Sequence, residues 1–227
     1  MNRRTFLKTL PAVAVLAGTE SIIGQDLEPI TLAKPQTDGG KSVLAALWER
    51  KTIRNIGSEK LPPQVLSNLL WAAFGVNRRN GPFAGGTGRT AASASNSQEI
   101  DLYVALPEGV YLYEAIPHRL TPVVAGDFRA RAGRRAAAGA AVNIFYVVDI
   151  AKYKNAPFQE PGLRDPEIQK SYYYVATGLI AQNVYLFAAS QGLAAHFHNC
   201  DKTNTPGEFK LRPEQRVLFA QTVGYPA

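Results

Sequence analysis

A short cationic segment in the first quarter of the chain has the residue types that bind phosphate groups. Residues 50–54 read Arg-Lys-Thr-Ile-Arg and follow an expected amphipathic helix. Cationic side chains offer charge-assisted hydrogen bonds to phosphate oxygens, and a hydroxyl can fix one further oxygen. The same residues would equally suit a solvated helix end, because basic side chains favour the C-terminal end of the helix dipole. The phosphate-binding candidates are Arg50, Lys51, Thr52 and Arg54.

A run of small polar residues could contact a planar ligand. Residues 92–98 read Ala-Ser-Ala-Ser-Asn-Ser-Gln and lead into an expected strand. Small side chains let the backbone approach a ring, while Asn and Gln can each donate and accept hydrogen bonds at its polar edge. An isolated string of this kind is also typical of an ordinary polar loop. The candidates here are Ser93, Asn96 and Gln98.

Two histidines alternate in a third segment near the C-terminal end. His196 and His198 lie in Ala-His-Phe-His-Asn-Cys, so they share one face of an expected strand. The only nearby carboxylate in sequence is Asp201, and Cys200 is the only cysteine. We therefore expect no metal site and no intrachain disulfide. Ligands often gather where strands end, and the ligand-binding candidates of this segment are Phe197, His198 and Asn199.

The elements that must position these segments are helices and strands. Apolar residues at helical spacing predict three helices, at residues 42–50, 62–74 and 168–190. Runs rich in Val, Tyr and Phe predict four strands, at residues 100–106, 109–114, 143–150 and 216–223. The third helix has so little charge that we expect it to be central and buried. This order indicates an α+β fold in which helices surround a mixed sheet.

The stretches between these elements are expected to be loops or short elements. Gly, Asn, Arg and Ser make residues 77–97 a long exposed loop. A short extended segment reaches Asn199 after the third helix, and Pro213 can open a last helical turn.

The first 24 residues have the order of an export signal. Residues 3–8 read Arg-Arg-Thr-Phe-Leu-Lys and precede a short apolar stretch and small residues. The paired arginines with the apolar residues behind them resemble a twin-arginine signal, which exports folded proteins that often carry a cofactor. The apolar stretch is too short for a permanent membrane anchor. We expect a signal at residues 1–24, a linker at residues 25–40, a domain at residues 41–227 and a periplasmic product.

Composition is that of one globular domain. The 227 residues are 46% hydrophobic and 19% charged, with a formal net charge of +7. A moderate positive charge suits an anionic cofactor or substrate as well as a polyanion. Because no helix-turn-helix, zinc-finger or RNA-reading signature is present, we expect no nucleic-acid binding.

Taken in order, the segments resemble the nitroreductase family. Residues 50–54 are similar to its Arg-Arg-Ser-x-Arg motif, and residues 93–98 resemble its Pro-Ser-x-x-Asn-x-Gln loop. Gly-Leu-Ile-Ala-Gln-Asn-Val-Tyr-Leu at residues 178–186 resembles the family's central helix, and Val-Gly-Tyr-Pro at residues 223–226 its closing strand. In addition, Gly-Val-Tyr-Leu-Tyr at residues 109–113 resembles the branch that contains the azoline-oxidising dehydrogenases of peptide natural products.

The resemblance implies a homodimer with two FMN sites at the interface. Residues 50–54 would hold the ribityl phosphate and the ring edge from one subunit, and residues 93–98 would approach the isoalloxazine from the other. Residues 197–199 would lie along the ring near its reactive nitrogen. The flavin would carry the hydride chemistry, so no catalytic side chain is assigned. A ping-pong scheme between a donor and a nitro, quinone or related small-molecule acceptor is implied.

Two other functions stay open at this point, a dehydrogenase of a peptide heterocycle and a flavin-binding module without turnover. The chain also departs from the family pattern. Ala92 stands where the family has Pro, Glu99 and Ile100 replace a Pro-aromatic pair, and the sequence ends at Ala227 without a basic tail. We therefore expect weaker FMN binding than is usual in the family. A periplasm has no nicotinamide pool, so the electron donor is left open.

Overall fold

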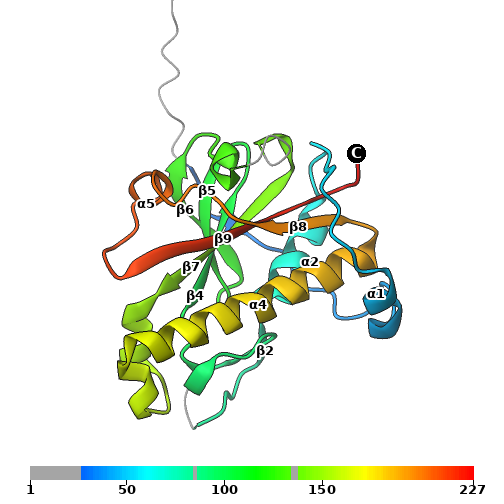
Figure 1. Ribbon diagram of the computed structural model, residues 1–227. Coiled ribbons are helices and arrows are strands. Elements are labelled where there is room, and N and C mark those ends of the chain that lie inside the picture. Colours follow the sequence, from blue (N-terminus) through cyan, green and yellow to red (C-terminus); the bar gives the residue numbers. More distant parts are fainter. Residues whose placement is uncertain (1–26, 84–85, 134–137) are drawn as a thin grey trace, which may run out of the picture.

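The computed structural model describes residues 27–83, 86–133 and 138–227 (Figure 1). Its α-helices are α1 (Val43–Glu49), α2 (Pro63–Phe74), α4 (Pro166–Gln191) and α5 (Thr205–Glu208). Short 3-10 helices are η1 (Ala94–Asn96), η2 (Arg129–Ala132), η3 (Ile150–Asn155) and η4 (Pro161–Arg164). The strands are β1 (Ile30–Thr31), β2 (Val76–Arg78), β3 (Gly88–Arg89), β4 (Ile100–Ala105), β5 (Gly109–Glu114), β6 (Arg119–Ala125), β7 (Val142–Asp149), β8 (Ala194–His198) and β9 (Gln215–Gly224).

A seven-stranded sheet with the order β1-β6-β5-β4-β7-β9-β8 forms the centre of the domain, and β2 pairs with β3 separately. Each pairing in the large sheet is antiparallel. The α+β class is confirmed, but the sheet is antiparallel where we expected a mixed one. The reason lies in β9, which inserts between β7 and β8 and is antiparallel to both. The crossover through α4 therefore creates no direct parallel pair.

The long helix α4 crosses one face of the sheet diagonally, with α2 packed against it and α1 near its C-terminal end (Figure 1). The Asp165 side chain caps its first turn by accepting hydrogen bonds from the backbone nitrogens of Glu167 (2.8 Å) and Ile168 (3.3 Å). Gly192 ends the helix in the left-handed conformation, with φ of 71°. The predicted helix is confirmed and slightly longer than expected.

Only one side of α4 is buried. Ile180 and Val184 are fully buried against the core, whereas Val175 is 62% and Leu179 44% exposed. The expectation of a buried central helix is therefore correct for one face alone. Within a single chain, the sheet and α2 cover one stripe of the helix and leave a second apolar stripe at the surface.

Side chains alternate across the strands, so the sheet has an apolar core on each face. Ile144 and Tyr146 of β7 point towards α4 and α2. Phe145 and Val147 point the other way and pack against Phe209, which follows α5. All of β7 is buried, as its continuous apolar run predicted.

Part of the expected linker belongs to the domain. β1 pairs with β6, and Leu32 is only 8% exposed. The Ser67 hydroxyl donates to the carbonyl of Ala33 at 2.5 Å, and the Gln64 side-chain amide donates to the carbonyl of Lys34 at 2.9 Å. The packed domain therefore includes residues before position 41. The expected export signal lies outside the described residues.

Three local expectations need correction. β6 was not predicted, because Pro122 interrupts its pattern; the proline is tolerated because the short β1 pairs only with the N-terminal end of β6. The expected loop at residues 77–97 contains the β2–β3 hairpin. The chain near Pro213 forms a turn, and the short helix lies earlier, at α5. None of the described helices combines the length and the apolar character needed to cross a membrane.

Candidate functional site

The cationic segment leaves the end of α1 and runs along the edge strand β8. The Ser42 side chain accepts a hydrogen bond from the Ala45 backbone nitrogen at 3.3 Å and so caps the start of α1. The helix ends at Glu49, and beyond it the backbone nitrogen of Ile53 donates to the carbonyl of Ala195 at 3.1 Å. This contact fixes the segment against β8. The side chains of Lys51 and Arg54 are exposed.

The hydroxyl of Tyr185 connects the cationic segment to β8. It accepts a hydrogen bond from the backbone nitrogen of Phe197 at 2.8 Å and lies 3.1 Å from the Thr52 hydroxyl. Because an amide can only donate, the tyrosine hydrogen is available for the Thr52 oxygen. When Tyr185 donates to Thr52 in this way, the hydrogen of Thr52 is available for a ligand. The Arg50 guanidinium carbon lies 5.4 Å from the centre of the Tyr185 ring, within the range of a cation–π contact.

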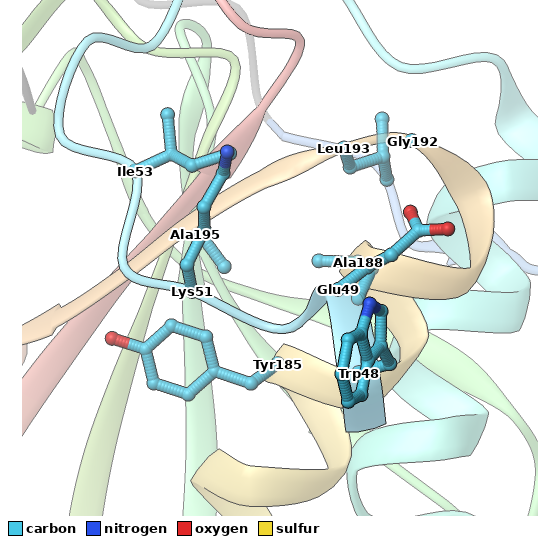
Figure 2. A pocket seen from close by; sticks show the side chains of 10 residues that line it. Trp48, Glu49, Lys51, Ile53, Tyr185, Ala188, Gly192, Leu193 and Ala195 are labelled. Atoms are coloured by element: carbon cyan, nitrogen blue, oxygen red, sulfur yellow. The ribbon is translucent and has the colours of Figure 1, made fainter. Parts of the chain in front are cut away.

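A cavity of about 370 Å³ lies between the end of α1, the last turns of α4 and the start of β8. In Figure 2 the side chains of Trp48 and Glu49 stand at one side of this cavity, while the Tyr185 ring lies below the loop that carries Lys51. The Glu49 carboxylate forms an ion pair with Lys41. Lys51 thus brings the candidate phosphate-binding segment to the cavity.

The polar loop is closed on itself by hydrogen bonds. The Gln98 side-chain amide donates to the carbonyl of Thr87 (2.7 Å) and to the Asn96 side-chain oxygen (3.1 Å). The side-chain oxygen of Gln98 accepts from Nε of Arg89 at 2.7 Å. The Ser93 hydroxyl accepts from the backbone nitrogen of Gln98 at 3.0 Å. Gln98 therefore uses its carboxamide to support the loop.

Three non-glycine residues of this loop have left-handed backbone conformations. Their φ angles are 52° at Ser95, 54° at Asn96 and 50° at Gln98. Such conformations cost energy and persist where the surrounding contacts hold them, which is common at ligand-binding sites. The loop is a strained, prearranged element, and its Ser93 borders a concavity of about 460 Å³ that also contacts Val175 and Leu179 of α4.

The third candidate segment presents different residues on the two faces of β8. Phe197 lies on the α4 face, where its ring centre is 4.8 Å from that of Phe219. The predicted shared face of His196 and His198 is confirmed, since their ring centres lie 4.6 Å apart and both are buried. Nε2 of His198 lies 2.8 Å from the Thr222 hydroxyl, on the side of the sheet away from Tyr185.

The ends of this segment differ in exposure. Nδ1 of His198 lies 2.9 Å from the carbonyl of Asn199, whose side chain is exposed. Within the described ranges, no three His, Cys, Asp or Glu side chains gather in a group that could hold a metal ion. Phe197 thus lies on the side of the sheet that faces α4 and Tyr185, and the side chain of Asn199 is open to solvent.

Comparison with known proteins identifies the family. Residues 47–225 match the model described as Nitroreductase family. The chain belongs to the nitroreductase family. A relative from Methanocaldococcus jannaschii, provisionally described as a nitroreductase, is 30% identical over 161 residues, which cover 65% of this chain and 73% of the relative. Family and fold together support a flavin oxidoreductase in general.

Solved structures share the nitroreductase fold. A protein from Ralstonia eutropha JMP134, also provisionally described as a nitroreductase, has a TM-score of 0.76 and 32% identity, and the match covers 88% of this chain and 90% of that one. A chain of the E. coli microcin synthetase McbBCD complex, solved with truncated pro-MccB17, has a TM-score of 0.60 and 17% identity over 97% of this chain and 84% of its own. At that identity the likeness shows the fold alone.

Within one nitroreductase chain, the two main candidate segments do not meet. The cationic segment borders α4 at Tyr185, whereas the polar loop borders it near Val175. These positions are ten residues apart on one helix, which corresponds to about 15 Å. Arg50–Arg54 therefore lies beside the C-terminal turns of α4, and Ser93–Gln98 lies nearer the middle of the helix.

Tyr185 is the residue that sequence reasoning missed. Its hydroxyl contacts the cationic segment at Thr52 and the β8 segment at Phe197. The sequence did contain a signal for Tyr185, a polar hydroxyl inside a helix of very low charge. A buried tyrosine hydroxyl usually has a hydrogen-bond partner, so this signal indicates a contact with another segment.

Proposed function

We propose that this protein is an FMN-dependent oxidoreductase that works as a homodimer and transfers hydride from a donor to a nitro, quinone or related small-molecule acceptor. The observation that carries the proposal is the Tyr185 hydroxyl network, which fixes Thr52 beside Lys51 and the cavity. Membership of the nitroreductase family supports it. The acceptor class and the homodimer rest on resemblance to that family.

The cationic segment has the properties needed to hold the FMN phosphate. In the described part of the chain, Arg50, Lys51 and Arg54 form no ion pair with a carboxylate, so their charges are available to an anion. When Tyr185 donates in its contact with Thr52, Thr52 can donate its own hydroxyl hydrogen to the phosphate. Cations with one oriented hydroxyl are a chemically suitable donor set for a phosphate ester.

A second copy of the chain would complete the site. Val175 and Leu179 on α4, and Leu44 and Trp48 on α1, are exposed apolar side chains, and Trp48 is 90% exposed. Burial of such surface favours association. A partner packed on this surface would also bring its own Ser93–Gln98 loop towards the cationic segment, whereas within one chain the two segments border α4 at positions about 15 Å apart along the helix.

The roles of the chain's own residues follow from this arrangement. When bound, FMN would supply the hydride chemistry in alternating half-reactions with the donor and the acceptor. Thr52 and the nearby cations would bind and orient the phosphate. Arg89 would hold the polar loop in shape through its hydrogen bond to Gln98. Phe197, which packs against Phe219, would supply an apolar surface beside the bound flavin. We assign no side chain as a proton donor.

We also propose export by the twin-arginine route to the periplasm. The support is the order of residues 3–18, with paired arginines before an apolar stretch. Replacement of both Arg3 and Arg4 by Lys should retain the protein in the cytoplasm, as measured by cell fractionation. Unchanged delivery of this double variant to the periplasm would exclude that route.

Anaerobic titration of the FMN-loaded protein with NADH and with NADPH tests the proposed activity. We expect the flavin absorbance to bleach and to recover when a nitroaromatic or quinone acceptor is added. A flavin that no donor bleaches, including dithionite-reduced viologen, would contradict turnover and favour a flavin-binding module.

Matched variants test the proposed phosphate contacts. Lys51→Ala and Thr52→Val should each raise the dissociation constant for FMN about tenfold, the factor expected for one charge-assisted hydrogen bond. Lys154→Ala removes another exposed lysine outside the site and should leave FMN binding unchanged. Equal affinity in all three variants would contradict the assignment of the phosphate site.

A further inference from the structure

A fully buried carboxyl group lies directly behind the polar loop. Glu99 is 0% exposed and follows Gln98 at the start of the sheet. Its Oε2 lies 2.7 Å from the Ser97 hydroxyl, and its Oε1 is buried without a hydrogen-bond partner among the described residues. A buried carboxylate with so few donors would be strongly disfavoured. This position is one of those at which the sequence departs from the family pattern.

The hydrogen bonds of Ser97 favour the protonated form of Glu99. The Ser97 hydroxyl lies 2.8 Å from the carbonyl of Ala94 as well as 2.7 Å from Glu99. A serine hydroxyl has one hydrogen, and a carbonyl can only accept. Ser97 can serve both contacts fully only if it donates to Ala94 and accepts a hydrogen from the carboxyl group of Glu99. A neutral carboxylic acid at Glu99 therefore satisfies both contacts, whereas a carboxylate would compete with Ala94 for the one hydrogen.

The charged and titratable groups around Glu99 are consistent with a neutral acid. Lys152 of η3 is directed to the carboxylate of Asp101 and to the carbonyl of Gln98 (3.2 Å). Tyr153 of η3 also interacts with Glu99, and Tyr172 and Tyr173 of α4 lie behind Tyr153. Burial raises the pKa of Glu99, and the opposing effects of Ser97, the Glu99 backbone, Tyr153 and Lys152 are smaller.

Glu99 contacts a residue that lies between two strained residues of the loop. The flanking residues Asn96 and Gln98 have left-handed φ angles, whereas Ser97 lies in the right-handed helical region. Ser97 closes the turn through its backbone nitrogen and its hydroxyl, which both donate to Ala94. The carboxyl of Glu99 fixes the orientation of that hydroxyl.

We propose that Glu99 is a positioning residue for the Ser93–Gln98 loop. As a neutral acid, Glu99 keeps the loop in the shape that binds flavin, and when Glu99 ionises the loop loses that shape. The proposal rests on the proposed FMN function. An ionised Glu99 could only accept the Ser97 hydrogen, so the bond from Ser97 to Ala94 would be lost. Since the acid form is favoured in the folded loop, its contribution is present at low pH and is lost as the pH rises through the folded-state pKa.

Infrared spectroscopy tests the protonation state without FMN. At about pH 7, where exposed carboxyl groups are ionised, the wild-type protein should show the carbonyl band of a protonated carboxyl group. The band should disappear in Glu99→Gln. It should remain in Glu160→Gln, because Glu160 contacts the same loop through Ser95 (3.2 Å) from a partly exposed position. Absence of the band from the wild type would overturn the proposal.

FMN titrations at several pH values test the positioning role. As the pH rises through the range in which Glu99 ionises, the dissociation constant of the wild type should rise about tenfold, as expected for one lost hydrogen bond in the loop. Glu99→Gln can still donate to Ser97 and should lack this rise, which Glu160→Gln should keep. Equal pH profiles of wild type and Glu99→Gln would overturn the proposal.

The wild type alone gives a further check if Glu99→Gln does not fold. The midpoint at which the infrared band is lost must coincide with the midpoint at which FMN binding weakens, and separate midpoints would overturn the role in flavin binding. Failure of the proposed function has a different signature. The band would be present, but no FMN would bind at any pH.

Discussion

The hydroxyl of Tyr185 lies 3.1 Å from the hydroxyl of Thr52, although the two residues are 133 positions apart in the chain. The same tyrosine oxygen accepts the backbone nitrogen of Phe197 at 2.8 Å. One side chain of α4 thus joins the cationic segment to the edge strand β8. When Tyr185 donates in this contact, the one hydroxyl hydrogen of Thr52 is available for a ligand.

Tyr185→Phe should lower the free energy of unfolding by about 1–2 kcal/mol, because the half-buried Phe197 nitrogen loses its acceptor. Thr52→Val should lower it by less, since no backbone group loses its partner. The double variant should be less destabilised than the sum of the two, by about 0.5–1 kcal/mol. Urea denaturation of the four proteins measures this coupling, and strict additivity would show that the two hydroxyls do not interact.

Val175→Glu should convert the proposed homodimer to a monomer, because it places a charge in the exposed apolar stripe of α4. Ile116→Glu is a suitable control, since Ile116 is 72% exposed in the turn between β5 and β6. Sedimentation velocity should show a dimer for the wild type and for Ile116→Glu. A wild-type monomer that binds FMN normally would contradict the shared site.

Acid should weaken the attachment of the N-terminal segment through His118. Nε2 of His118 lies 2.8 Å from the Ser67 hydroxyl, which donates to Ala33, and Nδ1 lies 2.9 Å from the Tyr113 hydroxyl. Ser67 therefore accepts from Nε2, and Nδ1 accepts from Tyr113, which describes a neutral imidazole. Burial lowers the pKa of His118 below its usual 6.5.

The pH dependence follows from the sign of that shift. A histidine with a lowered folded-state pKa stabilises the fold above about pH 6.5, and this contribution is lost as the pH falls through the folded-state pKa. The free energy of unfolding should therefore decrease from about pH 7 to pH 5 by more in the wild type than in His118→Gln. Parallel curves for the two proteins would rule out this contribution.

Cys200 should be unreactive in the folded protein. The side chain is 8% exposed, and burial raises the pKa of its thiol from 9.0 to about 11. That shift lowers the thiolate fraction near neutral pH roughly 100-fold. Alkylation by iodoacetamide should be at least that much slower in buffer than in concentrated urea. Rapid alkylation of the native protein would show that the thiol is accessible.

The sequence predicted the elements with strong local signals and missed those that depend on long-range pairing. Ser42, Pro63 and Gly192 mark the helix ends correctly because caps are local features. The strand β6 was missed because Pro122 is compatible with a strand only where no neighbour needs its amide. Local patterns also do not determine that β9 inserts between β7 and β8.

In the candidate site, too, local features were predicted and long-range contacts were missed. Alternation along β8 predicted that His196 and His198 share a face, but the sequence does not say which face meets α4. The role of Tyr185 was missed because its partners, Thr52 and Phe197, come from distant segments. The assignment of residues 50–54, 93–98 and 197–199 to an FMN site stays a prediction.

FMN binding is best measured first by a visible absorption spectrum of the purified full-length protein, followed by fluorescence titration with FMN. We expect a flavin spectrum, or saturable uptake of one FMN per chain, with weaker uptake by Thr52→Val than by Lys154→Ala. A colourless wild-type protein that is folded by circular dichroism and takes up no FMN would show that the protein is not a flavoprotein.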